Sequence, residues 1–233
     1  MSNVLTKNIA NATTCLNLLG GCMAIICAFK GEQPLWGLRG FEWAYIFIAI
    51  AAIADFMDGF SARIFHAYSL LGKELDSLCD LVSFGVAPAM LVFNIAGLEV
   101  DMEWVGWLAL LIPVCGALRL ARFNVAPSNN DFFRGLPIPA NAVFWIGFTS
   151  FCVEPGGVNG WIMLLAIVAV SWLMISPVKL FTLKFSSFGW KGNQARWLLI
   201  VAAVALLACC GLSGLMWLIV YYAAWGICVG AQK

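Results

Sequence analysis

The sequence predicts an all-α integral membrane protein, a polytopic bundle of about eight transmembrane helices that forms a single membrane domain over residues 1–233. Of its 233 residues, 63% are hydrophobic and only 11% are charged, against roughly half and a quarter in an ordinary soluble domain. The apolar residues form long runs without the alternation typical of strands, so these runs favour helices. This composition excludes a soluble globular protein.

Eight apolar runs are the expected spans, and each approaches the roughly 20 residues that cross about 30 Å of hydrocarbon. In chain order they are residues 14–29, 41–63, 78–97, 104–123, 139–153, 161–175, 196–210 and 214–230. Gly, Pro or charged residues separate each run from the next. A Gly-rich segment around Pro34 divides the first two, acids at 99–103 follow the third, and Pro137 and Pro139 mark the start of the fifth. Lysines precede the seventh, and glycines divide the last two.

The distribution of Lys and Arg predicts the orientation, because short cytoplasmic loops collect these residues. With the N-terminus in the cytoplasm, eleven of the 13 Lys and Arg fall on the cytoplasmic side, and only Lys30 and Arg39 fall on the other. We therefore expect a multi-pass protein with both termini and the active site cytoplasmic. Segment 1–11 is typical of an anchor rather than a removable signal, and a compact chain without a targeting segment favours a prokaryotic cell membrane. The net charge of +1 lacks the basic footprint of a nucleic-acid-binding protein, so no nucleic-acid partner is expected.

Four aspartates are expected to converge where the second and third helices meet. Asp55 and Asp58 lie three residues apart, and Asp76 and Asp80 lie four apart, so each pair shares one helix face. The short segment between the pairs makes the two helices antiparallel neighbours. Clustered anions at the edge of hydrocarbon need compensating cations. Oxygen-only ligation indicates Mg²⁺ or Mn²⁺, which keep open positions for phosphate oxygens.

The same residues form a pattern that resembles the signature of the CDP-alcohol phosphatidyltransferase family. That signature is D-x2-D-G-x2-A-R-x8-G-x3-D-x3-D, and its eight fixed positions are occupied here by Asp55, Asp58, Gly59, Ala62, Arg63, Gly72, Asp76 and Asp80. Segments 11–17, 116–124 and 133–140 are similar to segments of the branch that makes phosphatidylserine. The resemblance covers residues 8–190, with residues 196–230 as two additional C-terminal helices.

The resemblance implies a six-helix catalytic core, often dimeric, in which a CDP-linked lipid donates its phosphatidyl group to an alcohol and CMP is released. Asp55, Asp58 and Asp76 would hold metal on the diphosphate, while Asp80 would touch a second ion and act as the general base. The small residues Gly59 and Ala62 would pass close to the cytidine diphosphate. The CDP-lipid would also contact three further side chains, Arg63, Thr14 and Asn17.

The expected substrates are CDP-diacylglycerol and L-serine. A serine carboxylate needs cations, and Arg119 and Arg122 share a helix face three residues apart, where planar guanidinium groups suit bidentate carboxylate binding. Asn124 and Arg134 lie close to them in sequence. We expect these four residues to bind the acceptor.

Two alternatives remain at the level of sequence. A sibling transferase would use glycerol 3-phosphate or an inositol phosphate as the acceptor. A cation or proton carrier would use the acidic cluster as its ion site, although a carrier usually places such acids near the membrane midplane in repeated halves. The clustering at one surface, without a matching motif in the second half of the chain, favours the enzyme.

Overall fold

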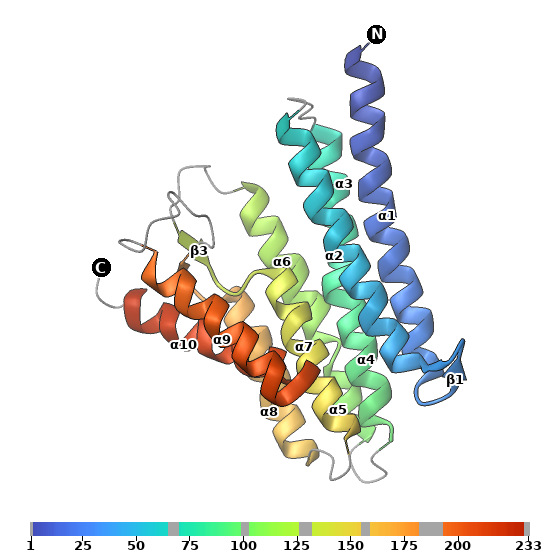
Figure 1. The fold of residues 1–233 in the computed structure, drawn as a ribbon, viewed down its shortest axis with the longest axis vertical. Helices are drawn as coiled ribbons and strands as arrows, with labels where there is room; N and C mark the ends of the chain where they lie inside the picture. Colours follow the sequence, from blue (N-terminus) through green and yellow to red (C-terminus); the bar gives the residue numbers. More distant parts are fainter. Residues whose placement is uncertain are drawn as a thin grey trace.

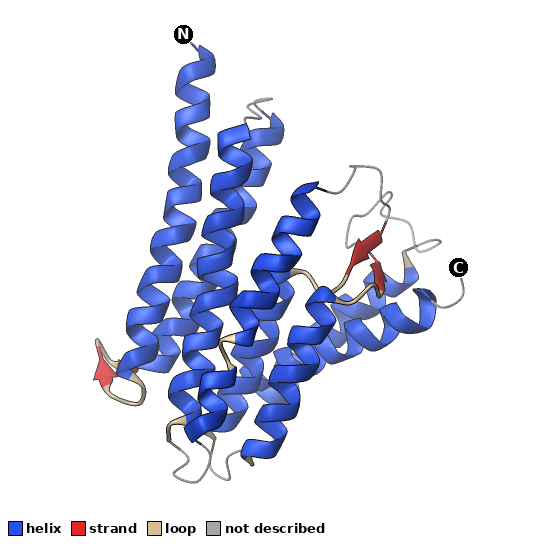
Figure 2. Cartoon of the chain, turned by 180° about the vertical axis from the view of Figure 1, so that it is seen from behind, coloured by secondary structure: helices blue, strands red, loops and turns tan. Residues whose placement is uncertain are grey.

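The computed structural model describes residues 2–64, 70–98, 103–125, 132–154, 159–181 and 193–230, and the described chain is mostly helical (Figures 1 and 2). The first half holds α1 (Ser2–Lys30), α2 (Gly40–Ile64), α3 (Leu70–Asp80), the π-helix η1 (Leu81–Val86), α4 (Ala87–Ala96), α5 (Glu103–Leu108) and α6 (Leu111–Val125). The second half holds α7 (Ile138–Val153), α8 (Gly160–Ile175), α9 (Gln194–Cys210), the 3₁₀ turn η2 (Gly211–Ser213) and α10 (Gly214–Gly230).

The all-α membrane prediction is confirmed, because helix occupies nearly all of the eight expected apolar ranges, apart from turns at Gly97 and at residues 109–110. Five helical stretches of the described chain are long and apolar enough to cross a membrane, and α7 and α8 are shorter apolar helices. The third helix begins at Leu70, eight residues before the expected start at residue 78. The apolar run marks the start of the expected membrane span and not of the helix, because residues 70–77 mix three leucines with charged and polar residues.

Two short antiparallel sheets of two strands each lie outside the helices. β1 (Pro34–Leu35) pairs antiparallel with β2 (Leu38–Arg39) across a two-residue turn. Both turn residues, Trp36 and Gly37, have positive φ, which matches the right-handed twist of a two-residue hairpin. The second sheet pairs β3 (Phe132–Arg134) with β4 (Lys179–Phe181) and joins the segments that precede α7 and follow α8.

Helix α1 packs along α2 and also contacts α3, η1 and α4 (Figure 1). Small residues allow this close approach, as is common between membrane helices. A Cβ at Gly21 would lie 2.8 Å from the Cα of Ser83, and a Cβ at Gly20 would lie 3.1 Å from the Cβ of Ala51. Glycine at position 21 therefore brings α1 against the π-helix, directly beside the aspartate region.

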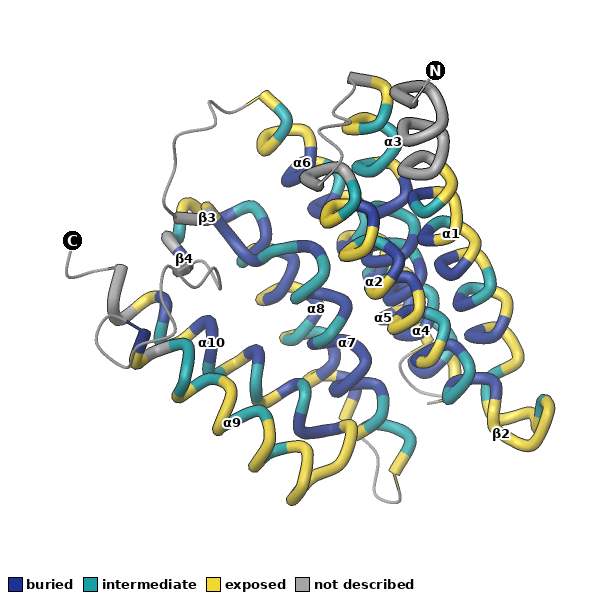
Figure 3. The backbone as a smooth tube through the Cα atoms, turned by 45° about the horizontal axis from the view of Figure 1, so that its top comes forward, coloured by how far each residue is buried: buried dark blue, intermediate teal, exposed yellow. Residues whose placement is uncertain are grey.

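Helix α7 is the most enclosed of the later helices, and it packs against α4, η1 and α10 (Figure 3). Its Trp145 is fully buried. Helices α9 and α10 lie side by side, because Gly211 adopts the left-handed φ of +58° at the end of α9 and the chain turns back. A positive φ of this size is sterically unfavourable for a residue with a Cβ, so position 211 favours glycine. Most of α9 faces outward (Figure 3).

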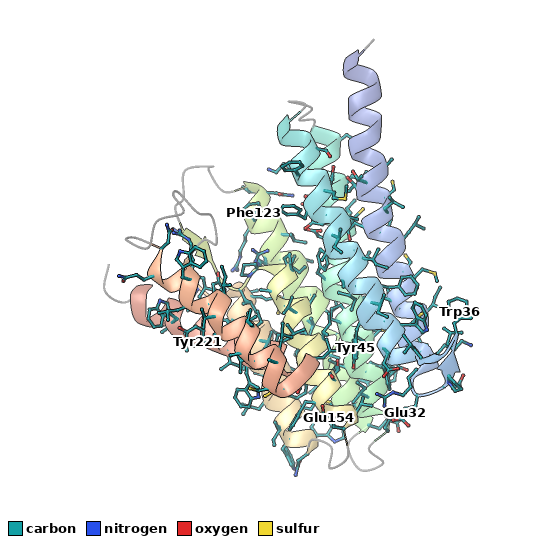
Figure 4. The ribbon with its side chains drawn as sticks, in the orientation of Figure 1. Glu32, Trp36, Tyr45, Phe123, Glu154 and Tyr221 are labelled. Atoms are coloured by element: carbon teal, nitrogen blue, oxygen red, sulfur yellow. The ribbon has the colours of Figure 1, made fainter. Side chains whose placement is uncertain are left out.

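The two ends of the bundle differ. Figure 4 shows Glu32 and Glu154 near one end, which also carries the β1–β2 hairpin. The C-terminal end of α2 and the N-terminal end of α3 lie at the opposite end (Figure 1). Asp55 lies in the half of α2 toward this end, and Asp76 and Asp80 lie in the first half of the continuous helix formed by α3, η1 and α4. The fold therefore places the carboxylates toward one surface of the bundle.

Candidate active site

Three of the four predicted aspartates form one group, here called the carboxylate cluster: Asp55 of α2 and Asp76 and Asp80 of α3. One carboxylate oxygen from each lies within 4.8 Å of the others, close enough to share a metal ion. Asp80 is buried, with 9% exposure, and the other two are partly buried. The helical spacing explains the arrangement, because the i and i+4 positions of α3 lie on one face opposite α2.

Asp58 lies one turn beyond Asp55 on α2 but accepts hydrogen bonds from α1 instead of joining the carboxylate cluster. The hydroxyl of Thr14 donates to Asp58 Oδ2, and Thr13 Oγ1 donates to Oδ1 at 3.4 Å. Asp58 is 8% exposed. Two hydroxyl donors partly replace the water that this buried carboxylate has lost. Thr14, expected to contact the CDP-lipid, therefore contacts a signature aspartate in this structure.

Asn17 of α1 contacts Asp80 directly. Its Nδ2 donates to Asp80 Oδ1 at 3.0 Å, and Ser83 Oγ donates to the backbone carbonyl of Asn17 at 2.8 Å. Asn17 is fully buried, and its Oδ1 has no hydrogen-bond partner among the described residues. Helix α1 thus braces Asp58 and Asp80 from one face and keeps one acceptor oxygen available.

Arg119 of α6 is a buried cation near the carboxylate cluster. Its side chain is 9% exposed, its Nε has no hydrogen-bond partner among the described residues, and its guanidinium interacts electrostatically with Asp80. The phenol of Tyr222 on α10 interacts electrostatically with the same guanidinium. A buried guanidinium with an unsatisfied N–H is costly, so this geometry favours an anionic ligand.

The other residues expected to bind the acceptor lie on α6 and β3. Arg122 donates from Nη1 to the carbonyl of Ile175 at 2.9 Å and is exposed. Asn124 donates to Ser77 Oγ at 2.9 Å and thereby ties the end of α6 to α3. Arg134, the last residue of β3, is exposed. Of the four, only Arg119 is buried beside the carboxylate cluster.

The signature residues that follow Asp58 leave space beside it. Gly59 is exposed, and no described atom outside its own turn lies within 4 Å of where its Cβ would be. The backbones at Ala62 and Arg63 are helical, but their side chains lie outside the described part of the structure. The open surface at Gly59 is compatible with a ligand that approaches the helix backbone.

Four polar residues near the site were not singled out from the sequence: Thr13, Ser83, Asn141 and Tyr222. Ser83 and Asn141 lie inside apolar runs, and a polar residue inside an expected membrane span signals a functional or structural need. The sequence therefore contains a signal that could have singled out Ser83 and Asn141. The contact of Tyr222 with Arg119 depends on how α10 folds back, and no local pattern predicts it.

The carboxylate cluster fits a divalent cation. Among the residues that the structure describes, no Lys or Arg forms an ion pair with any of its three members. Three carboxylates this close repel one another unless a cation or protons compensate them. Their donor atoms are all oxygens, the ligand type of hard cations such as Mg²⁺ and Mn²⁺. The residues can therefore hold a metal ion.

Known proteins are similar in sequence to this chain over most of its length. CDP-diacylglycerol–serine O-phosphatidyltransferase of Mycobacterium tuberculosis is 35% identical over 212 residues, which are 85% of this chain and 68% of that protein. The enzyme of the same name from Methanocaldococcus jannaschii is 38% identical over 173 residues, 73% of this chain and 72% of that protein. Archaetidylserine synthase of Methanothermobacter thermautotrophicus is 37% identical over 169 residues, 70% of this chain and 65% of that protein.

The sequence model of the CDP-alcohol phosphatidyltransferase family matches residues 7–229, a range that includes the carboxylate cluster and helices α9 and α10. Because this match covers nearly the whole chain and agrees with the eight-residue signature, the protein belongs to the CDP-alcohol phosphatidyltransferase family.

Proposed function

We propose that this protein transfers the phosphatidyl group of CDP-diacylglycerol to the hydroxyl of L-serine and releases CMP. The observation that carries the proposal is the carboxylate cluster with the buried Arg119 beside Asp80. The names of all three relatives above contain serine, although their lipids differ. Family membership also favours the transferase over a cation carrier.

The donor diphosphate is proposed to bind at the carboxylate cluster. Asp55, Asp76 and Asp80 would hold divalent metal, Mg²⁺ or Mn²⁺, with two ions and Asp58 as a further ligand in the fully loaded site. When bound, such metal neutralises negative charge on the diphosphate oxygens and on the departing CMP. Thr13 and Thr14 keep the Asp58 carboxylate in place.

The transfer is proposed as a direct displacement. The serine hydroxyl oxygen forms a bond to the phosphorus that carries the diacylglycerol, and the bond from that phosphorus to the CMP oxygen breaks. The serine proton passes to Asp80, and CMP leaves with the electron pair as an anion. Asn17 holds one oxygen of Asp80, which orients the carboxylate so that its remaining lone pairs can accept the proton. A positioned base of this kind contributes about 10²–10⁴-fold.

Arg119 is proposed to bind the serine carboxylate. Its guanidinium is buried, interacts with Asp80 and has an unpartnered Nε. Pairing with a carboxylate satisfies the N–H groups with charge-assisted bonds. Arg122, Asn124 and Arg134 would contribute at the rim.

The cytidine end of the donor is proposed to lie over the open surface at Gly59, with Ala62 giving close access and Arg63 contacting the phosphates. The unpartnered Oδ1 of Asn17 offers an acceptor to an N–H or O–H of the bound donor, and Thr14 lies one turn before it. The bias of Lys and Arg in the sequence supports a cytoplasmic location for this end of the bundle.

The test is acceptor-dependent release of CMP. Purified protein in detergent is given CDP-diacylglycerol and Mg²⁺ or Mn²⁺, and then L-serine, glycerol 3-phosphate or an inositol phosphate in separate reactions. We expect release with serine and recovery of phosphatidylserine. Release with only a phosphate-bearing acceptor would overturn the serine assignment, and no release with any acceptor would overturn the transferase.

A further inference from the structure

We propose that Asn141 of α7 is a positioning residue for Asp80, and that it acts through the π-helix η1 without touching the substrates. The inference rests on the proposed function, in which Asp80 takes the serine proton. Asn141 lies outside the family signature and is fully buried. Its side chain contacts η1, which begins immediately after Asp80.

The π-helix gives Asp80 an unusual support. In η1 the backbone bonds span five residues, as in the bond from the Ala87 N–H to the Val82 carbonyl. Such turns are rare and recur at functional sites. Compared with an α-helix, the wider turn shifts the side chains on its two sides relative to each other. It therefore sets the angle at which Asp80 faces Asp55 while α4 continues into the core.

The carbonyl of Phe84 needs an outside partner, because the residue four positions later is Pro88, which has no N–H to donate. Asn141 supplies that partner. Its Nδ2 donates to the carbonyl of Phe84 at 2.8 Å, and its Oδ1 accepts from Trp145 Nε1 at 2.9 Å. An indole N–H can only donate, so Trp145 fixes the orientation of the amide with its NH₂ group toward η1. Asn141, Phe84 and Trp145 are fully buried, so no water can replace the bond.

Two paths lead from this bond to the reacting carboxylate. Phe84 lies one turn after Asp80 on the continuous helix, so a shift of η1 moves Asp80 directly. The neighbouring Ser83 donates to the Asn17 carbonyl at 2.8 Å, and Asn17 in turn donates to Asp80 at 3.0 Å. Both supports of Asp80 therefore depend on the position of η1. A misplacement of about 1 Å at a reacting group can cost about 10²-fold in rate.

The test compares Asn141→Leu with Thr149→Val. Thr149 is a matched control, because it is equally buried on α7 and its hydroxyl bonds to the carbonyls of Trp145 and Ile146. Its side chain also interacts with Tyr45 of α2, and none of these partners belongs to η1. We expect Asn141→Leu to lower kcat about 10- to 100-fold, with the KM values for both substrates within about threefold of wild type. Thr149→Val should stay near wild type in both parameters.

A second readout does not use the reaction. Binding of Mn²⁺ to the substrate-free protein, followed by electron paramagnetic resonance, should weaken about 10-fold or more in Asn141→Leu, as is usual when support around a ligand is removed. It should be unchanged in Thr149→Val. If Asn141→Leu does not fold, Trp145→Phe is the second test, because it keeps an aromatic side chain, although a smaller one, and removes the N–H that orients the amide. A smaller change in the same direction is expected.

The outcomes separate the two proposals. Equal kcat and equal Mn²⁺ affinity in the Asn141 or Trp145 variant and the Thr149 variant would overturn the positioning role. A wild-type protein that binds Mn²⁺ but releases no CMP would overturn the proposed function, and the Mn²⁺ comparison would still decide the role of Asn141.

Discussion

The two ends of the bundle carry acidic groups in opposite situations. Near the β1–β2 hairpin, Glu42 accepts from the Arg39 backbone at 2.8 Å and from its guanidinium at 3.1 Å, and the Arg39 and Glu42 side chains are 47% and 34% exposed. At the other end, the carboxylate cluster gathers three acids without an ion pair among the described residues. The first group is satisfied by its own neighbours. The second lacks a compensating cation among the described residues, and we therefore propose it as the functional end.

Removal of divalent metal should have the largest effect on activity, and it tests the difference between the two ends of the bundle most directly. Chelation with excess EDTA should abolish CMP release, because the carboxylate cluster then loses the charge that holds the diphosphate, and a metal stabilises such a transition state by several kcal/mol. Mg²⁺ or Mn²⁺ should restore activity. The measurement is CMP release before and after chelation, and full activity in excess chelator would contradict a metal role for the cluster.

The substitution Asp80→Asn should have the second-largest effect on turnover. The variant keeps the shape of the side chain but removes the base, so turnover should fall about 10²–10⁴-fold. Binding of CDP-diacylglycerol, measured by calorimetry, should be retained. Glu42→Gln at the opposite end is the matched control and should turn over normally. Near-normal turnover of Asp80→Asn would reassign the base.

Arg119→Met should have a smaller and more selective effect. Loss of a charge-assisted contact of about 1.5–3 kcal/mol corresponds to a roughly 10- to 150-fold higher KM for serine. The KM for CDP-diacylglycerol should change little.

Arg119→Lys sharpens this test. A lysine keeps the charge but loses the planar fork, so its KM for serine should lie between those of the wild type and Arg119→Met. A loss of stability in Arg119→Met with an unchanged KM for serine would show that Arg119 is structural.

The smallest effect is expected at the hairpin end. Removing the ion pair in the double variant Arg39→Gln, Glu42→Gln should lower the free energy of unfolding by at most about 1 kcal/mol, since exposed pairs contribute little. Activity should be unchanged. A strong loss of activity in this variant, measured as CMP release, would show that the two ends are coupled.

Local pattern was sufficient for much of this protein. The apolar runs predicted helix over each of the eight ranges, because burial in hydrocarbon requires every backbone group to bond within its own segment. The spacing of Asp55, Asp76 and Asp80 predicted their meeting, because two antiparallel helices with a short connection must bring those faces together. That spacing also placed Asp76 on the third helix, although the apolar run of that helix began only at residue 78.

Other features depended on contacts between distant segments. Asp58 lies with the hydroxyls of α1, Arg119 is the buried arginine of the four residues expected at the acceptor site, and Asn141 reaches a carbonyl of η1. The sequence by itself determined the membrane helices, the family signature and the acids available for metal. Only the tertiary structure decided which polar side chains pair with which, because a hydrogen bond depends on angles and distances of a few ångströms between helices, and residue spacing along one helix does not specify them.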